Sequence, residues 1–211
     1  MFRRYKVFHI ASLISLAIAI MIFAVSQSMG KANLFLLLNT DLGRVADYYL
    51  KAFTNLGDGV LWILIALFLW KYKRSFLYLC IYLFALSTVI TQVFKYFIIP
   101  DEPRPTKALA GNNTIHVVPN VELHTVSSFP SGHTATAFCF FLLGCIVFND
   151  KRWLYFGLLY ALLVGYSRVY LAQHFPFDVA GGIIVALISA YISLFIFERL
   201  PAGKKPHNKI S

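Results

Sequence analysis

Six apolar stretches constrain this chain more than any other feature. They cover roughly residues 7–27, 59–70, 75–99, 131–148, 153–171 and 178–198, the second being shorter than the others. A helix needs about 20 predominantly apolar residues to cross the hydrocarbon core of a bilayer. The sequence therefore predicts an all-α fold, an integral membrane bundle of six transmembrane helices.

The composition agrees with a membrane protein. Of the 211 residues, 59% are hydrophobic and 13% are charged, whereas soluble domains are about half apolar and about a quarter charged. The length predicts one domain over residues 1–211. The three cysteines fall inside apolar stretches and have no metal-binding spacing, so we expect them to be small buried hydrophobes.

Residues 31–54 differ from the six stretches because charged and apolar side chains alternate there at helical spacing. This pattern predicts an amphipathic helix that lies in the membrane interface. Its apolar positions are Leu34, Phe35, Leu38, Leu42, Val45, Tyr49 and Phe53, and its charged positions are Asp41, Arg44, Asp47 and Lys51.

Basic residues mark one side of the predicted bundle. Twelve of the 19 cations lie there with only two acids, Asp150 and Glu198, whereas the opposite side has seven cations and seven acids. The twelve are Arg3, Arg4, Lys6, Lys71, Lys73, Arg74, Lys151, Arg152, Arg199, Lys204, Lys205 and Lys209. Positively charged loops stay in the cytoplasm. We therefore predict a multi-pass protein of the inner (plasma) membrane with both termini cytoplasmic.

The net charge of +10 is thus a signal of topology. No nucleic acid is expected as a partner, because the basic groups occupy short separate loops and do not form one continuous patch. The first apolar stretch follows basic residues, as a secretory signal does, but it is long for a signal. We interpret it as an uncleaved anchor.

A phosphate-binding pattern opens the fourth stretch as Pro130-Ser131-Gly132-His133. Gly132 lets a ligand approach the backbone closely, and the first N–H groups of a helix point outward at its positive end. Such a helix start is a ready anion site. Ser131 either adds its hydroxyl to this site or caps the helix, and His133 is expected to point into the same space.

A second cluster of ionisable residues lies between the fifth and sixth stretches. His174 and Asp178 are four residues apart, so they share a face where the chain is helical. Pro176 between them is tolerated only in the first turn of a helix. The pair is typical of a carboxylate that orients an imidazole for nucleophilic attack. Charged groups at membrane depth are functional candidates by default, and Arg168 precedes this pair.

Two further cations lie on the same predicted face as these motifs. Arg104 stands between two prolines and offers a planar fork to phosphate oxygens, and Lys95 offers a point charge. Together with Arg168 they would surround a phosphoryl group, which is the electrostatic part of phosphoryl transfer. The remaining histidines have no charged partner at a useful spacing and receive no role. They are His9, His116, His124 and His207.

At these residues the chain resembles the type 2 phosphatidic acid phosphatase superfamily, the metal-independent lipid phosphate phosphatases. That family has three motifs. They match Lys95 with Arg104-Pro105, then Pro130-Ser131-Gly132-His133, then Ser167-Arg168 with His174 and Asp178. The chain departs from the family pattern in the first motif, where the spacing between Lys95 and Arg104 is longer, around Pro100–Pro103. The small size resembles bacterial lipid phosphatases.

The resemblance implies a mechanism. His174 would attack phosphorus and form a phosphohistidine while Asp178 holds its imidazole, and His133 would protonate the leaving oxygen. The oxygens of the phosphoryl group would be held by Lys95, Arg104, Ser131, Gly132 and Arg168. Neither a metal nor another cofactor is expected.

The resemblance leaves the lipid open. The expected reaction is hydrolysis of a lipid phosphate or diphosphate monoester on the outer (periplasmic or extracellular) face, by an enzyme surrounded by membrane lipids. Undecaprenyl diphosphate and lipid A come first among the candidates, followed by phosphatidylglycerol phosphate and phosphatidic acid. Two alternatives are a lipid phosphotransferase with the same site and an anion transporter. The transporter is disfavoured because the charges lie at helix ends and no inverted repeat is present.

Overall fold

The computed structural model describes residues 4–199 as an all-helical protein, with no strand in that range. The helices are α1 (Lys6–Met29), α2 (Lys31–Leu38), α3 (Arg44–Asn55), α4 (Leu61–Tyr72), α5 (Leu77–Val93), α6 (Pro105–Ala108), α7 (Gly132–Phe148), α8 (Lys151–Tyr170) and α9 (Pro176–Arg199). A 3₁₀ turn, Arg74–Phe76, precedes α5, and a π-helical turn, Phe94–Ile98, follows it. The expected all-α class is confirmed.

Each of the six apolar stretches is helical, and its ends lie within two residues of the predicted ones when the 3₁₀ and π-helical turns are counted with α5. Three helical runs are long and apolar enough to cross a membrane: Lys6–Met29, Arg74–Ile98 and Pro176–Arg199. Helices α4 and α7 are apolar but shorter. The number of spans therefore stays a prediction at six.

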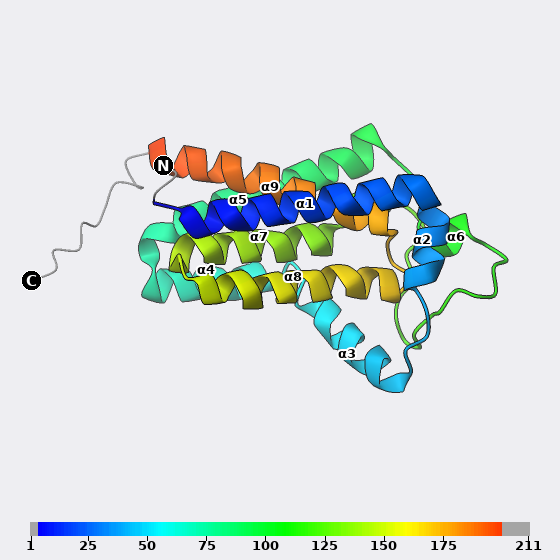
Figure 1. Ribbon diagram of the computed structural model, residues 1–211. Helices are drawn as coiled ribbons and strands as arrows, with labels where there is room; N and C mark the ends of the chain where they lie inside the picture. The colour runs from blue at the N-terminus through cyan, green and yellow to red at the C-terminus, as the bar shows by residue number, and fades with distance from the viewer. Residues whose placement is uncertain (1–3, 200–211) are drawn as a thin grey trace, which may run out of the picture.

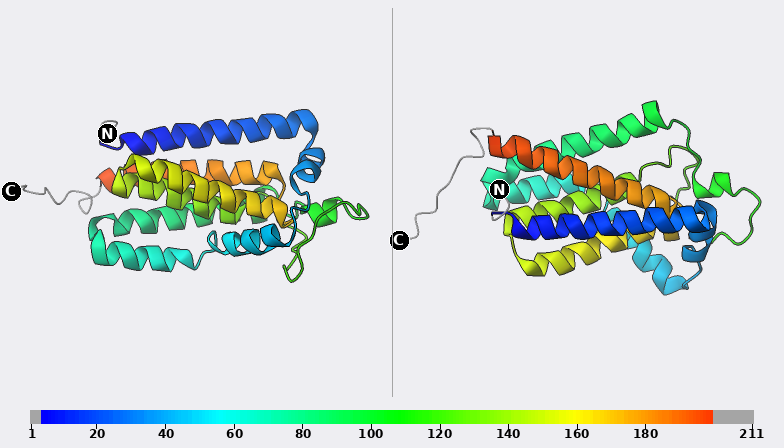
Figure 2. Two further views of the ribbon diagram at one scale, coloured as in Figure 1. Left: turned by 60° about the horizontal axis from the view of Figure 1, so that its bottom comes forward. Right: turned by 45° about the horizontal axis from the view of Figure 1, so that its top comes forward.

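The segment 31–54 was expected to be one interfacial helix, and this was wrong, because α2 and α3 are separated there by residues 39–43. Gly43 adopts a positive φ of 86°, which disfavours a continuous helix. The side chain of Asn39 donates to the carbonyls of Val169 (3.1 Å) and Tyr170 (2.8 Å), so the break also caps the end of α8. In Figures 1 and 2, α2 crosses the end of the bundle and α3 lies oblique to the long helices.

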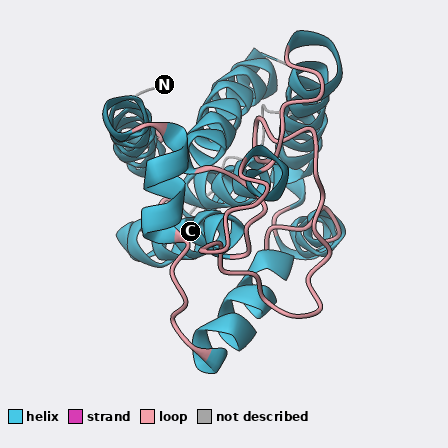
Figure 3. Cartoon of the chain, turned by 90° about the vertical axis from the view of Figure 1, so that its right-hand side faces the viewer, coloured by secondary structure: helices cyan, strands magenta, loops and turns pink. Residues whose placement is uncertain are grey.

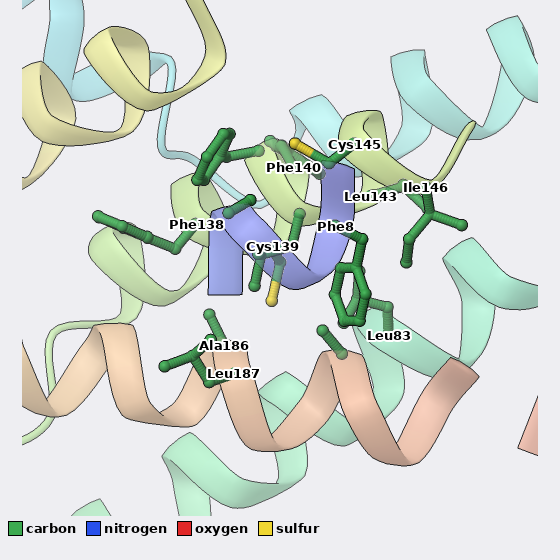
Figure 4. Packing of buried hydrophobic residues seen from close by; sticks show 14 of the residues in the cluster. Phe8, Leu83, Phe138, Cys139, Phe140, Leu143, Cys145, Ile146, Ala186 and Leu187 are labelled. Atoms are coloured by element: carbon green, nitrogen blue, oxygen red, sulfur yellow. The ribbon is translucent and has the colours of Figure 1, made fainter. Parts of the chain in front are cut away.

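Helix α7 forms the centre of the bundle and is buried along nearly its whole length. It packs against α1, α5, α8 and α9. Figure 4 shows Phe138 and Cys139 of α7 facing Ala186 and Leu187 of α9, with Phe8 and Leu83 nearby. All three cysteines are free and buried, as expected for small hydrophobes. Apolar side chains on the outer helices remain exposed, which suits contact with lipid.

The two ends of the bundle differ in charge. The start of α1, the end of α9 and the α4–α5 and α7–α8 connections lie at one end (Figure 1), and they carry the described part of the predicted basic cluster. Glu198 joins the two outer helices there, since it contacts Tyr5 and forms an ion pair with Arg4 at 3.3 Å. The cluster members Arg3, Lys204, Lys205 and Lys209, like the ends of the predicted domain, lie outside the described residues.

Candidate active site

The motif residues lie at the other end of the bundle, where long connections cross the helix ends (Figure 3). The connection between α8 and α9 is a tight turn centred on the last residues of α8. The carbonyl of Arg168 accepts hydrogen bonds from the backbone N–H groups of Gln173 (2.9 Å) and His174 (3.1 Å). Pro176 is the first residue of α9, the position that the sequence required. This turn holds His174 beside Arg168.

His174 and Asp178 lie next to each other as the spacing predicted. Nδ1 of His174 is 3.5 Å from Oδ2 of Asp178 and forms no hydrogen bond with the described residues. Both side chains are buried, with exposed fractions of 1% and 3%. Oδ2 of Asp178 also accepts hydrogen bonds from the Ser128 hydroxyl (2.5 Å) and from the Phe175 N–H (2.9 Å). These two bonds fix the carboxylate, so its position is set before a ligand binds.

The second motif begins α7, as expected, and Ser131 is its N-cap. The Ser131 hydroxyl oxygen accepts from the N–H (3.4 Å) and the hydroxyl (2.9 Å) of Thr134. The Ser131 N–H donates to the carbonyl of Asp178 (3.0 Å). Of the two roles considered for Ser131, the structure shows the cap, and its role in phosphate binding stays a prediction. The Gly132 N–H, by contrast, has no hydrogen-bond partner among residues 4–199.

Glycines of α9 allow the second and third motifs to meet. A Cβ at Gly182 would lie 2.6 Å from the carbonyl oxygen of Ser131, and one at Gly181 would lie 2.4 Å from the Phe129 ring. Any larger residue at these positions would push α9 away from the start of α7. No role was predicted for Gly181 or Gly182 from the sequence.

Arg168 lies in the last turn of α8, and its buried guanidinium contacts Thr54 of α3. Its Nη1 donates to the hydroxyl of Thr54 at 2.5 Å, and its buried Nε has no hydrogen-bond partner among the described residues. An unpaired buried guanidinium N–H is costly in the absence of a bound acceptor. Thr54 could not be predicted as a partner from the sequence, because it lies 114 positions before Arg168.

Arg104 is buried at the start of α6 and is held by loop carbonyls. Its Nε donates to the carbonyl of Val126 (3.0 Å), and its Nη1 donates to both the carbonyl and the side-chain oxygen of Gln173 (3.1 Å each). Gln173 is itself fixed by a bond from its amide to the carbonyl of Glu122 (2.6 Å). Because Gln173 directly precedes His174, the first and third motifs are linked through this side chain.

Lys95 lies in the π-helical turn Phe94–Ile98, and its charge interacts with those of Arg104, Arg168 and Asp178. The longer spacing of the first motif is therefore taken up by the turn at residues 99–103, without removing Lys95 from the cluster. His133 interacts electrostatically with the same three cations and with Asp58. All of the predicted site side chains thus gather at one end of the bundle.

The clustering of charged groups changes the pKa values of His174 and Arg104, which lie outside the long helices. Burial lowers the pKa of His174 well below its ordinary value of 6.5, and the charges of Arg104, Arg168 and Lys95 lower it further. Burial also lowers the pKa of Arg104, an effect that Asp178 opposes. His174 is therefore a neutral imidazole at pH 7, which is the nucleophilic form.

Three supporting residues were missed, and the reasons differ. Ser128 stands just before the second motif and Gln173 stands inside the third, so nearness to a motif was a signal for both. Thr54 lies in α3, and only the fold brings it to Arg168. Each of the three forms a hydrogen bond with a predicted site residue.

His116 was also given no role, because it has no charged neighbour at a useful sequence spacing, yet the fold supplies one. Its Nε2 lies 3.0 Å from Oδ1 of Asp47, and its Nδ1 lies 4.0 Å from Asp41. Oδ1 of Asp47 also accepts a bond from the Tyr170 hydroxyl at 2.6 Å. Among the described residues, Asp41, Asp47 and His116 form the one group with the ligand types of a metal site. However, Oδ1 of Asp47 already forms hydrogen bonds with His116 and Tyr170.

Residues 75–201, more than half of the chain, match the family model of the PAP2 superfamily. The chain is 30% identical over 168 residues to the lipid A 4'-phosphatase of Bacteroides thetaiotaomicron, covering 74% of this chain and 72% of that protein. It is 32% identical over 92 residues to the undecaprenyl-diphosphatase BcrC of Bacillus subtilis, covering 43% of each.

Two solved structures are similar. The crystal structure of Aquifex aeolicus LpxE is 29% identical, with a TM-score of 0.66, over 77% of this chain and 93% of that one. A transmembrane PAP2 type phosphatidylglycerolphosphate phosphatase from Bacillus subtilis has a TM-score of 0.62 over 95% of this chain and 98% of that one, and at 22% identity it supports the fold alone. The resemblance of the motifs is thus confirmed, together with the expected enzyme class of a membrane lipid phosphate phosphatase. The chain belongs to the PAP2 superfamily.

Proposed function

We propose that this protein hydrolyses a lipid phosphate or diphosphate monoester through a phosphohistidine at His174. The observation that carries the proposal is the burial of a neutral His174 between the Asp178 carboxylate and three cations. Such a group is a nucleophile at neutral pH, and the cations around it stabilise the charge that develops on a transferring phosphoryl group.

The proposed reaction has two steps. Nδ1 of His174 faces Asp178, which leaves Nε2 to attack phosphorus. The N–P bond forms as the bond from phosphorus to the lipid oxygen breaks, and His133 gives its proton to that oxygen. Water then attacks the phosphohistidine, His133 takes a proton from it, and inorganic phosphate leaves as His174 is restored. No metal takes part in either step.

The proposed binding groups for the phosphoryl oxygens are Lys95, Arg104, Arg168 and the N–H of Gly132. The free Nε of Arg168 supports this role, because a bound phosphate would supply the acceptor that the protein does not. The Ser131 hydroxyl, engaged in capping, would act by holding the start of α7 in place.

We assign the site to the outer face of the inner (plasma) membrane, with both termini cytoplasmic and with residues 1–211 forming one membrane-embedded domain. The support is the charge asymmetry, because the basic clusters end the helices opposite the site. Six crossings are consistent with this arrangement, since an even number returns the chain to its starting side.

The direct test is phosphate release by the purified protein from a panel of lipid phosphates and diphosphates, with undecaprenyl diphosphate and lipid A included. Activity that persists in a chelator and is inhibited by vanadate supports the cation-only mechanism, and a strict requirement for a divalent metal contradicts it. Trapping of acid-labile ³²P on wild-type protein but not on His174→Ala would identify the intermediate. Product analysis with an added acceptor lipid separates hydrolysis from phosphotransfer.

A further inference from the structure

An ion pair joins α2 to the turn that lengthens the first motif, and the reaction proposed above gives it no part. Nζ of Lys31, the first residue of α2, lies 2.5 Å from Oε1 of Glu102 in the turn at residues 99–103. The two side chains are 45% and 28% exposed. Ion pairs with this exposure usually add little to the stability of a fold. The contacts at the two ends of the pair give it a more specific role.

The Glu102 end of the pair holds one of the two donors that fix Asp178. The backbone carbonyl of Glu102 accepts a hydrogen bond from the N–H of Ser128 at 3.0 Å. The hydroxyl of Ser128, which is fully buried, donates in turn to Oδ2 of Asp178 at 2.5 Å. A displacement of Glu102 would therefore move the hydroxyl that holds the carboxylate.

The Lys31 end of the pair lies over the other donor. Nζ of Lys31 is 5.1 Å from the centre of the Phe175 ring, within the range of a cation–π contact. Phe35, one helical turn further along α2, meets the same ring edge-on with 5.5 Å between the ring centres. The backbone N–H of Phe175 donates to Oδ2 of Asp178 at 2.9 Å. Helix α2, which crosses this end of the bundle (Figure 1), therefore covers the residue that supplies the second bond.

Both donors bond the same oxygen, and that oxygen faces the proposed nucleophile. Oδ2 of Asp178 is the atom that lies 3.5 Å from Nδ1 of His174. This separation is slightly longer than an N–H···O hydrogen bond, so a small shift of the carboxylate makes or loses the bond that orients the imidazole. The charges of Lys31 and Glu102 also interact with Asp178, the first by attraction and the second by repulsion.

We propose that Lys31 and Glu102 are positioning residues, whose ion pair keeps the Asp178 carboxylate aligned with His174 without contacting the substrate. The longer spacing of the first motif is thereby explained, because the turn at residues 99–103 brings Glu102 to α2. This inference rests on the proposed function and adds two residues to it.

A direct role for Lys31 in binding the lipid phosphate predicts a different result. Lys31 would then be an anion-binding cation, and Glu102 would compete with the substrate for it. Removal of the Glu102 charge would free the cation and lower KM. In the positioning role, by contrast, loss of either charge lowers kcat, because both ends of the pair are needed.

The test is a double-mutant cycle of Lys31→Met, Glu102→Gln and the double variant. Each protein is assayed in the same detergent for phosphate release from lipid A, undecaprenyl diphosphate and phosphatidic acid. We expect each single variant to lower kcat about tenfold, because misalignment of a reacting group is costly, and to change KM by less than about twofold. The double variant should also lose about tenfold, because the two residues act as one unit.

A conservative variant and a matched control complete the design. Lys31→Arg keeps both the ion pair and a cation over the Phe175 ring, so kcat should stay within about threefold of the wild type. Lys51→Met removes another lysine at this end of the bundle, one that donates to the carbonyls of Pro119 (3.3 Å) and Asn120 (2.8 Å). It should change kcat and KM by less than about twofold. Rates are referred to folded, monodisperse protein, so that poor folding is not counted as a loss of kcat.

The outcomes separate the inference from the proposed function. An unchanged kcat in Glu102→Gln, a change confined to KM, or losses that multiply in the double variant would overturn the positioning role and leave the phosphatase intact. Equal losses in Lys51→Met and Lys31→Met would overturn it as well. Phosphate release from none of the lipids by the wild-type protein counts against the proposed function, and the inference then falls with it.

Discussion

Two histidine–carboxylate pairs lie at the same end of this molecule, and only one of them has the surroundings of a nucleophile. His174 and Asp178 are buried, their closest atoms are 3.5 Å apart, and three cations act on the imidazole. His116 and Asp47 are closer, at 3.0 Å, and their neighbours are Asp41 and the hydroxyl of Tyr170. A histidine beside a carboxylate is therefore not enough to make a site for phosphoryl transfer, because cations are also needed to attract the phosphate.

The two pairs also differ in the parts of the fold to which they are attached. His174 is tied to Arg168 and, through Gln173, to Arg104. His116 lies in the loop between α6 and α7, and its imidazole contacts Asp47 of α3. Its backbone also forms hydrogen bonds with the side chain of Asn39, which follows α2. The first pair serves the proposed reaction, and the second holds the covering loop in place.

The largest expected difference is between His174→Ala and His116→Ala. Loss of the proposed nucleophile should lower kcat by at least about a thousandfold, whereas loss of His116 should lower it by less than about threefold. Phosphate release measured on folded, detergent-purified protein checks both. Similar losses in the two variants would remove the distinction between the pairs.

The next largest loss of kcat is expected from changes to the cations around His174. Arg168→Lys keeps a charge but loses the fork that bonds Thr54 and leaves Nε free, so kcat should fall about a hundredfold. Thr54→Val, which removes only the supporting hydroxyl, should cost about fivefold to tenfold. Steady-state kinetics at one pH give both values, and an unaffected Arg168→Lys enzyme would argue against a bidentate role.

The dependence on pH follows from the lowered pKa of His174. The imidazole attacks in its neutral form, so activity falls only when the pH drops to the lowered pKa, which is below 6.5. The acidic limb of log(kcat/KM) against pH should therefore lie below pH 6.5. Replacing Lys95 by methionine removes one of the charges that lower this pKa and should shift the limb to higher pH. A limb at or above pH 6.5 in the wild type would contradict this environment for His174.

The smallest effect concerns the second pair and stability. The bonds from Tyr170 and His116 lower the pKa of Asp47 below its ordinary value of 3.8. A carboxylate with a lowered pKa stabilises the fold above pH 3.8 and loses that contribution as the pH falls through the lowered value. Asp47→Asn should thus reduce Tm by about 2–4 °C at pH 7. The difference should shrink towards pH 3, and a constant difference would show that charge is not the cause.

The sequence predicted the parts of this molecule that depend on short-range pattern. Apolar length placed six helices to within two residues, and spacing within motifs placed His174 beside Asp178 and Ser131 at a helix start. Contacts between residues that are distant in sequence could not be predicted. Thr54 meets Arg168, and His116 meets Asp47, only because the fold packs α3 against α8. The break in 31–54 was missed because its reason is Asn39 bonding the end of α8.

The bond from the Ser131 N–H to the Asp178 carbonyl has a mechanical consequence. With Gly182 pressed against Ser131, the starts of α7 and α9 are held together by contacts within the protein, so the spacing of His133 from the Asp178 carboxylate does not depend on a ligand. We therefore expect any adjustment to a bound lipid to occur at Arg104, which is held by loop carbonyls, or at Lys95 in its π-helical turn.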